Sequence, residues 1–154
     1  MKRLELAVPP LLLTIVLALC MAALALATPE MSLGLGSASR LAGMTLMAAG
    51  IAICAAGVIA FRKAGTTVDP TRPEGASGVV QGGLYALTRN PMYLGFLLLL
   101  LGVAAALNHW PSLCLALLFI PYMNRFQIGP EERILSAKFG AQYAGYAERV
   151  RRWI

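Results

Sequence analysis

The chain has 154 residues, of which 58% are hydrophobic and 13% charged, and its formal net charge is +6. This composition excludes an ordinary soluble domain, because a fold of this size could not hide so much apolar surface from water. The positive charge does not indicate nucleic-acid binding, since Lys and Arg are scattered between apolar segments. We therefore predict a single all-α membrane domain over residues 1–154, with its backbone polar groups paired inside helices.

Four apolar runs predict a polytopic protein with membrane-crossing helices at residues 6–27, 41–61, 92–107 and 112–128. The first two reach the roughly 20 residues that span a hydrocarbon core. The last two are shorter and only four residues apart, which predicts a tight helical hairpin with Trp110 at the membrane interface.

The first run also has an alternative interpretation as a cleavable secretory signal. Lys2 and Arg3 precede it, and the small-residue motif Ala-Leu-Ala ends it. The run is longer than the usual core of a signal, and further apolar runs follow it. We therefore favour a retained helix.

The basic residues predict the orientation of the protein. With a cytoplasmic N-terminus, Arg40 alone would lie on the opposite side, and every other Lys and Arg would be cytoplasmic. The positive-inside rule therefore favours both termini in the cytoplasm, in what we expect to be a bacterial inner membrane. The polar loop 62–91 and the C-terminal tail then share the cytoplasmic face, and we expect the chemistry there.

The tail is predicted to form a separate helix over residues 130–150. Gly129 and Pro130 should end the fourth run, because Pro is tolerated in a first helical turn but not inside a helix. Apolar and aromatic residues then recur at helical spacing, which predicts an amphipathic helix on the membrane surface or against the bundle: Leu135, Phe139, Tyr143, Tyr146 and Val150.

Several kinds of catalytic site find no support in the sequence. There is no Ser-His-Asp set, phosphate-binding loop or zinc-ligand spacing, so we expect no metal. His109 is the single histidine and is expected to be an interfacial polar residue in the tight turn. Cys20, Cys54 and Cys114 each stand alone in an apolar run and are interpreted as small core residues.

Two polar clusters remain as candidates for chemistry. The first runs from Gly82 to Gly95, where glycines allow close approach of a ligand, Asn90 is a plausible helix cap and Arg89 could bind a carboxylate. The second is Glu131-Glu132, which could bind the ribose or amino group of a nucleoside. Both clusters also have a purely structural interpretation, as a capped helix with a snorkelling Arg and as acidic residues favoured by a helix dipole.

Together the clusters resemble the superfamily of isoprenylcysteine carboxyl methyltransferases and phospholipid N-methyltransferases, which are integral membrane enzymes. The resemblance covers residues 66–154. It rests on an ordered set of short motifs: Gly83-x-Tyr85, Arg89-Asn90-Pro91-x-Tyr93, Glu131-Glu132-x-x-Leu135, Phe139-Gly140-x-x-Tyr143-x-x-Tyr146 and Arg152-Trp153.

The resemblance implies an S-adenosylmethionine site between the loop, the third and fourth helices and the tail. Glu131 would be its principal acidic contact, with Glu132 beside it, and Arg89 would support the loop or the cofactor carboxylate. The other implied cofactor-binding residues are Ser77, Gly78, Val79, Val80, Tyr85, Asn90, Pro91, Met92 and Tyr93. Cofactor and acceptor would meet near Asn90, Tyr93 and Arg125, which are the residues expected to act in catalysis.

Two positions depart from the pattern of the carboxyl methyltransferases. Many of them have His where this chain has Asn90, and Arg where it has Gln127. Asn90 resembles the phospholipid and uncharacterised bacterial branches. The absence of Arg at Gln127 weakens the case for a prenylcysteine carboxylate as acceptor, although Arg125 could substitute.

The predicted function is therefore methyl transfer from S-adenosylmethionine to a lipid-like, membrane-borne acceptor with a carboxylate, amine or thiol nucleophile. Because the leaving group is already activated, positioning and desolvation can supply most of the acceleration. A small water-soluble thiol or amine remains an alternative acceptor. The alternative function is a non-enzymatic membrane scaffold or transporter subunit, but a transporter should carry ionisable residues inside its spans, which are nearly absent here.

Overall fold

The computed structural model describes residues 4–67, 69 and 71–154, which form helices joined by turns and loops. The all-α prediction is confirmed for these residues. Lys2 and Arg3 of the charge argument, and residues 68 and 70 of the predicted loop, lie outside the described residues.

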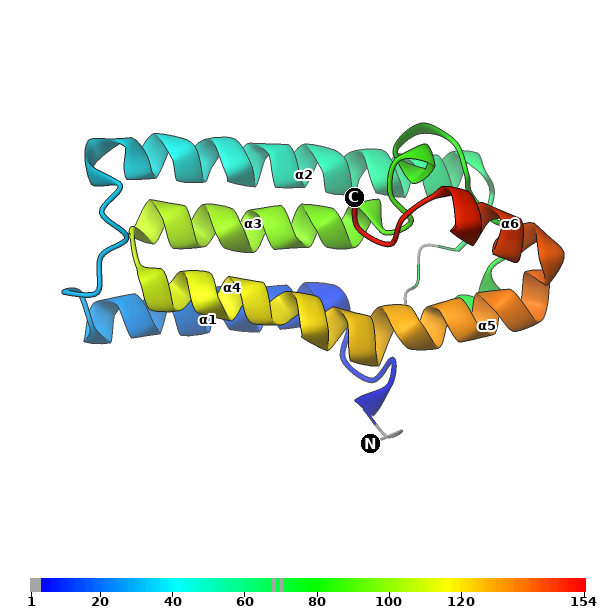
Figure 1. The fold of residues 1–154 in the computed structure, drawn as a ribbon, viewed down its shortest axis with the longest axis horizontal. Helices are drawn as coiled ribbons and strands as arrows, with labels where there is room; N and C mark the ends of the chain where they lie inside the picture. Colours follow the sequence, from blue (N-terminus) through cyan, green and yellow to red (C-terminus); the bar gives the residue numbers. More distant parts are fainter. Residues whose placement is uncertain (1–3, 68, 70) are drawn as a thin grey trace.

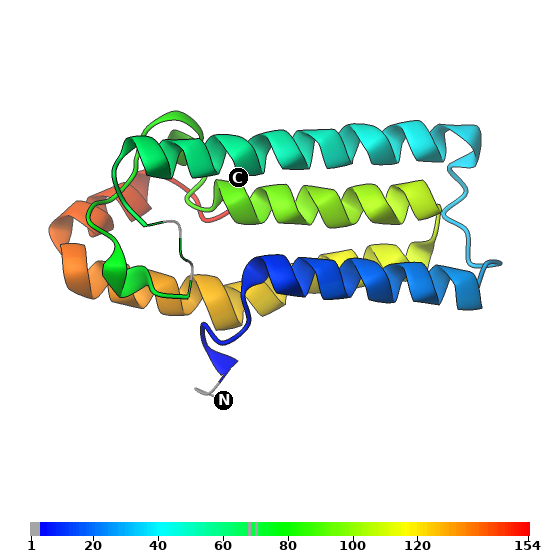
Figure 2. The same cartoon turned by 180° about the vertical axis from the view of Figure 1, so that it is seen from behind.

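Four long helices lie side by side: α1 (Pro10–Ala27), α2 (Ser39–Lys63), α3 (Pro91–Leu107) and α4 (Trp110–Met123). The α1–α2 and α3–α4 connections lie at one end of this bundle (Figure 1). The loop between α2 and α3, with its short helices η3 (Pro73–Gly75) and η4 (Gly83–Ala86), lies at the other end together with the C-terminal helices (Figures 1 and 2). The two polar clusters of the sequence therefore lie at the same end of the bundle.

Local residue chemistry sets the ends of these helices. Pro10 and Pro91 occupy the first turns of α1 and α3, where a missing N–H costs nothing. The first helix therefore begins four residues later than its apolar composition predicts. Asn108 ends α3 in the left-handed conformation at φ +50°, which Asn tolerates better than most residues.

Glycines bring α2 and α3 into direct backbone contact. A Cβ atom on Gly50 would lie 2.6 Å from the carbonyl oxygen of Gly95, and one on Gly43 would lie 2.6 Å from that of Gly102. Any side chain at these positions would push the helices apart, so small residues are required, as in other closely packed membrane helices. The sequence interpretation overlooked this seven-residue spacing.

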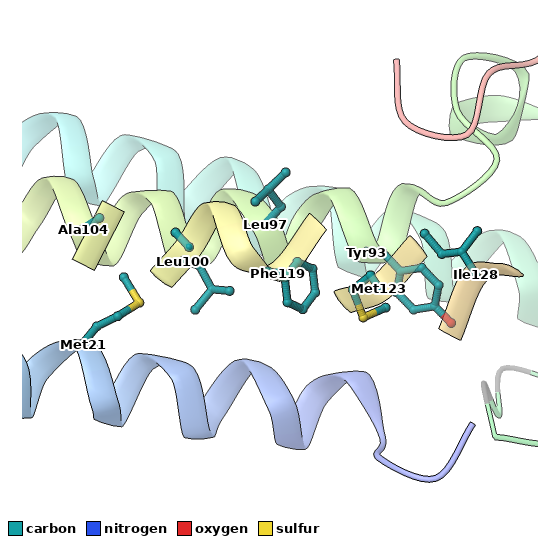
Figure 3. Close-up of a cluster of buried hydrophobic side chains, with 9 residues drawn as sticks. Met21, Tyr93, Leu97, Leu100, Ala104, Phe119, Met123 and Ile128 are labelled. Carbon is teal, nitrogen blue, oxygen red and sulfur yellow. The ribbon is translucent and has the colours of Figure 1, made fainter. Parts of the chain in front are cut away.

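A hydrophobic core lies between α1, α3 and α4, and Figure 3 shows Met21, Leu100 and Phe119 converging there from the three helices. The outward faces are also apolar, with exposed side chains such as Leu19 and Ile51. Two helical stretches, Pro10–Ala27 and Gly36–Lys63, are long and apolar enough to cross a membrane, whereas the apolar α3 is shorter. The total of four crossings stays a prediction.

The predicted break at Gly129 and Pro130 is wrong. A π-helical turn, η5 (Asn124–Ile128), connects α4 directly to α5 (Gly129–Phe139). Pro130 has no N–H to offer the carbonyl of Phe126, four residues earlier. The backbone N–H of Leu6 donates to that carbonyl instead, at 2.9 Å. The N-terminal segment thus satisfies the acceptor that Pro130 leaves free, and the helical path continues.

The predicted single tail helix over residues 130–150 is also wrong, because Gly140 at φ +50° separates α5 from α6 (Ala141–Arg149). Glycine takes this conformation at little cost, whereas a side chain would be strained. The chain reverses direction at Gly140, so the apolar and aromatic residues of α6 pack onto the loop. Tyr143, Tyr146 and Val150 are buried there, and Val79 of the loop packs against them. The last residues then return to the start of α3 (Figure 1).

His109 is buried, not interfacial as predicted. Its imidazole accepts a hydrogen bond from the backbone N–H of Ser112 and so caps α4. Its Nδ1 lies 2.8 Å from Ser112 Oγ, and its Nε2 lies 3.0 Å from Thr28 Oγ1. The histidine therefore ties α1 to α4 at the end of the bundle farthest from the loop.

The cysteines do not share the core location that was predicted for them. Cys20 and Cys114 are exposed on apolar outer faces, because an apolar run in a membrane-type bundle places side chains outward as well as inward. Cys54 is half-buried, and its Sγ donates to the carbonyl of Met92 at 3.3 Å.

Candidate active site

A cavity of about 110 Å³ lies where the end of α2, the loop, the first turn of α3 and the two C-terminal helices meet. Both polar clusters of the sequence contribute to its wall. The predicted site residues that line it are Gly78, Val79, Val80, Tyr85, Arg89, Asn90, Met92, Tyr93, Glu131 and Glu132.

Two predicted cofactor-binding residues do not line the cavity. The backbone N–H of Ser77 donates to Thr66 Oγ1 at 2.9 Å, and the Ser77 hydroxyl donates to the carbonyl of Gly65 at 3.1 Å. Pro91 is buried as the first residue of α3. Both residues shape the loop that forms the wall.

Arg125 lies outside the cavity, contrary to the predicted meeting point with Asn90 and Tyr93. Its Nη1 donates to Glu5 Oε1 at 3.1 Å, and its guanidinium lies 5.6 Å from the ring centroid of Phe126. Gln127 faces the site instead, and side chains two residues apart on a helical turn point to different sides. The position of Gln127 therefore requires Arg125 to face away.

Glu132 fastens the C-terminal tail to the loop. Arg89 Nη2 donates to its Oε1 at 2.7 Å, and Arg152 Nη2 donates to its Oε2 at 2.5 Å. Burial acts to raise the pKa of Glu132, but the hydrogen bonds and charges of the two arginines outweigh it and lower the pKa. Arg89 Nη1 also donates to the carbonyls of Ala147 and Val150. Glu132 thus forms an ionic clasp, that is, two ion pairs with Arg89 and Arg152 that hold the tail against the loop.

Glu131 has a different environment, although it is the adjacent residue. The Tyr93 hydroxyl donates to its Oε1 at 2.5 Å, and Gln127 Nε2 donates to the same oxygen at 2.7 Å. Burial raises the pKa of Glu131 to about 7, even though these two hydrogen bonds act to lower it. The cavity is therefore lined by a carboxyl group that changes its charge near neutral pH.

Asn90 does not cap α3 with its side chain, as was expected. Its amide Nδ2 donates to the carbonyl of Arg152 at 2.9 Å, and the Thr88 hydroxyl donates to the same oxygen at 3.2 Å. The returning tail offers this carbonyl as an acceptor, and the amide donates to it instead of to the end of the helix. Asn90 therefore joins the loop to the tail while lining the cavity.

Two buried polar atoms at the cavity have no hydrogen-bond partner within the described part of the chain: the Tyr85 hydroxyl and Arg89 Nε. Tyr85 is 4% exposed, and its ring lies 5.1 Å from that of Phe61. Tyr146 holds it in place by donating to its carbonyl at 2.8 Å. An unsatisfied buried donor costs about 1 to 3 kcal/mol, so two of them beside one cavity make it a candidate ligand site.

A second, apolar cavity of about 240 Å³ lies beside the first, between the start of α1, α2 and α3. It is lined by Pro9, Pro10, Leu11, Val58, Met92, Tyr93 and Phe96. Met92 and Tyr93 line both cavities and therefore form a shared wall. Figure 3 shows Tyr93 at the end of the apolar core near Ile128.

Sequence reasoning missed several residues that line the polar cavity, namely Phe61, Thr67, Asp69, Pro73 and Ala76. Phe61 lies in the last turn of α2, where its apolar run was read as a span alone. The others lie in the loop without a recognisable motif. Leu135, Tyr143 and Tyr146 were predicted as parts of a helix stripe and of the family motifs but not as site residues, and they also line the cavity.

Comparisons with known proteins identify the family of the chain. The chain matches the phospholipid methyltransferase family over residues 38–142. It is 33% identical over 111 residues to protein-S-isoprenylcysteine O-methyltransferase A of Arabidopsis thaliana, which covers 70% of this chain and 55% of that protein. The B form of the same plant is 32% identical over the same shares.

An uncharacterised protein of Haemophilus influenzae is 41% identical over 63 residues, which are 41% of this chain and all of that protein. This chain spans about half the length of the two plant relatives. No solved structure matches it significantly. Because the family match covers most of the chain, including both polar clusters, the chain belongs to the phospholipid methyltransferase family, within the superfamily that also contains the isoprenylcysteine methyltransferases.

Proposed function

We propose that the protein is a methyltransferase that transfers a methyl group from S-adenosylmethionine to a lipid-like acceptor held in the membrane. The observation that carries the proposal is the pair of adjoining cavities, one polar and one apolar, which share Met92 and Tyr93. Family membership and the methyltransferase names of the plant relatives support the reaction type.

The polar cavity has the chemistry that S-adenosylmethionine requires. Arg89 Nε, a buried donor without a partner in the described residues, suits the carboxylate of the amino-acid end. The Tyr85 hydroxyl can donate to a ribose or adenine acceptor. Aromatic rings and the carboxylate of Glu131 suit a sulfonium cation. These groups are separate from the atoms that Arg89 and Arg152 use to bind Glu132.

The bound donor would supply an activated methyl group, and the protein would contribute positioning and the exclusion of water. Tyr85, packed on Phe61, forms one rigid wall, and the α5–α6 reversal covers another. The apolar cavity would hold the hydrocarbon part of the acceptor, with its reactive head at the Met92–Tyr93 wall. Charged donor and apolar acceptor would thus approach from different sides.

The proposed location is a bacterial inner membrane, with the polar cavity and both termini on the cytoplasmic side. The cavity lies at the end of the bundle that carries most of the basic residues, including Arg62, Lys63 and Arg133. The positive-inside rule assigns that end to the cytoplasm. The lipid bilayer and an amphiphilic acceptor are the proposed partners.

Calorimetry of the purified protein in detergent tests donor binding, with S-adenosylmethionine and its demethylated product in separate titrations. We expect comparable affinities, because both share the adenine, ribose and amino-acid groups. Glu131→Gln should weaken binding more than the matched control Glu148→Gln, since Glu148 is exposed on α6.

Incubation with labelled S-adenosylmethionine and a membrane lipid extract tests the transfer itself. We expect label in an extractable lipid-like product. If neither nucleoside binds and no labelled product forms, the chain is better described as a non-enzymatic membrane scaffold.

A further inference from the structure

We propose that Tyr93 and Glu131 form a proton relay that removes a proton from the acceptor's nucleophilic atom, so that the acceptor carries an N–H or S–H group. This inference rests on the proposed function and deepens it by naming the chemical class of the acceptor. Tyr93 lines both cavities, as Met92 does, and its hydroxyl is hydrogen-bonded to Glu131.

The geometry gives the relay a direction. Tyr93 lines both cavities, whereas Glu131 lines the polar cavity only. An acceptor in the apolar cavity therefore contacts Tyr93 and not Glu131. The hydroxyl donates to Glu131 Oε1 at 2.5 Å, so its own proton already points along the path that the relay needs.

Gln127 holds Tyr93 and Glu131 in their relative positions. Its Nε2 donates to Glu131 Oε1 at 2.7 Å and to the Tyr93 hydroxyl oxygen at 3.4 Å. The π-helical turn η5 presents this side chain from the α4 side of the site. Gln127 is a positioning residue, because it contacts both members of the relay and lies outside both cavity linings.

The transfer balances in protons and electrons. The nucleophilic atom forms a bond to the methyl carbon while the carbon–sulfur bond of the sulfonium donor breaks and leaves its electron pair on sulfur. The proton of the nucleophile moves to the Tyr93 oxygen, and the hydroxyl proton of Tyr93 moves to Glu131 Oε1. Glu131 later releases the proton to water.

The charges around Glu131 suit this role. It accepts hydrogen bonds from Tyr93 on α3 and Gln127 on η5, and its charge also acts on Tyr85 in the loop and Tyr143 on α6. The adjacent Glu132 is paired with Arg89 and Arg152, and its charge still acts to raise the pKa of Glu131. Burial raises the pKa of Glu131 to about 7, close to the value that an efficient general base needs at neutral pH.

The same charges disfavour a carboxylate acceptor. Arg89 is the only cationic side chain among the described residues of the polar-cavity lining, and its Nη atoms are taken by Glu132 and two backbone carbonyls. A carboxylate at the Tyr93 wall would lie near the negative charge of Glu131. An ammonium or thiol group would instead lose its proton to that charge.

Kinetics with matched single-chain amphiphiles test the relay, using one hydrocarbon chain with an amine, thiol or carboxylate head. We expect methylation of the amine or thiol, and a fall in kcat of about 100-fold or more in Tyr93→Phe. The loss should shrink at high pH, where the amine loses its proton without help. Tyr122→Phe is the matched control, because Tyr122 packs on Phe126 outside both cavities.

Infrared titration of the ligand-free protein gives a second readout. We expect the carbonyl band of a protonated carboxyl group to disappear near pH 7 and to be absent in Glu131→Gln. In Tyr93→Phe the band should disappear at higher pH, because the Tyr93 hydrogen bond lowers the pKa of Glu131.

The outcomes separate the two proposals. Donor binding and product formation with an unchanged kcat in Tyr93→Phe would overturn the relay alone. Equal slowing of all head groups, or preferential methylation of the carboxylate amphiphile, would also overturn it. Failure of the wild-type protein to bind the donor and to methylate any of the three amphiphiles would overturn the proposed function as well.

Discussion

The two ends of the helical bundle both contain buried polar side chains, but they use them differently. At the α3–α4 turn, His109 links Thr28 to Ser112, and the Ser112 hydroxyl donates to the carbonyl of Met21. At the opposite end, within the described residues, two buried donors lack a partner and border a cavity. The first network closes on itself and holds helices together. The second leaves hydrogen-bonding capacity at a candidate ligand site.

The largest expected difference between the ends is in how the free energy of unfolding depends on pH. Because burial raises the pKa of Glu131 from 4.5 to about 7, its contribution to stability is complete below pH 4.5 and is lost as the pH rises through 7. At about 1.4 kcal/mol for each pH unit, the loss is on the order of 3 kcal/mol. Glu131→Gln should remove this loss, so the variant should be more stable than the wild type above pH 7.

Thermal unfolding in detergent between pH 4.5 and 8 measures the effect. Glu148→Gln is the control and should follow the wild-type curve. Parallel curves for Glu131→Gln and wild type would mean that Glu131 is not strained at neutral pH.

The next effect tests the end of the bundle at the α3–α4 turn, where His109 links the helices. His109→Ala leaves the Thr28 and Ser112 hydroxyls without their shared partner, and we expect a loss of about 2 kcal/mol in the free energy of unfolding. Donor affinity of the folded protein should not change. Denaturation and calorimetry on the same preparation measure both quantities, with Ser37→Ala as an exposed control at the same end. A loss of donor affinity would show that the two ends are coupled.

A smaller effect on stability and donor affinity is expected at the end of the bundle that contains the polar cavity. Tyr85→Phe removes a buried hydroxyl without a partner, so stability should stay the same or rise by about 1 kcal/mol. Affinity for S-adenosylmethionine should fall about fivefold, which corresponds to one neutral hydrogen bond of about 1 kcal/mol. Calorimetry with Tyr122→Phe as control measures this. Unchanged affinity would remove Tyr85 from the ligand contacts.

The smallest effect is expected for Arg125→Ala. Arg125 is about half exposed and paired with Glu5, and such surface pairs contribute at most about 1 kcal/mol. Donor affinity and the Michaelis constant for a confirmed acceptor should both stay unchanged. Steady-state kinetics decide this. A raised Michaelis constant would restore the acceptor contact that the sequence predicted for Arg125.

Much of the cavity wall was predictable because its residues are close together in sequence. Arg89, Asn90, Met92 and Tyr93 follow one another at the start of a helix, and any ligand near one of them meets the others. The local pattern marked Glu131 and Glu132 alike, as acidic residues after Pro130, and only the resemblance to the family singled out Glu131. Their partners were harder to predict, since the clasp to Glu132 and the amide bond of Asn90 depend on where the tail returns.

The sequence by itself determined the helical class, the four apolar runs and the location of the two polar clusters at one end. Composition and local periodicity carry this information, because a helix pairs its backbone with residues only four positions away. Tertiary structure alone decided the continuous path through η5, the reversal at Gly140 and the outward position of Arg125. It also decided that Glu131 and Glu132 differ. Their pKa values are shifted in opposite directions because one carboxylate is buried against neutral donors and the other is held between two arginines.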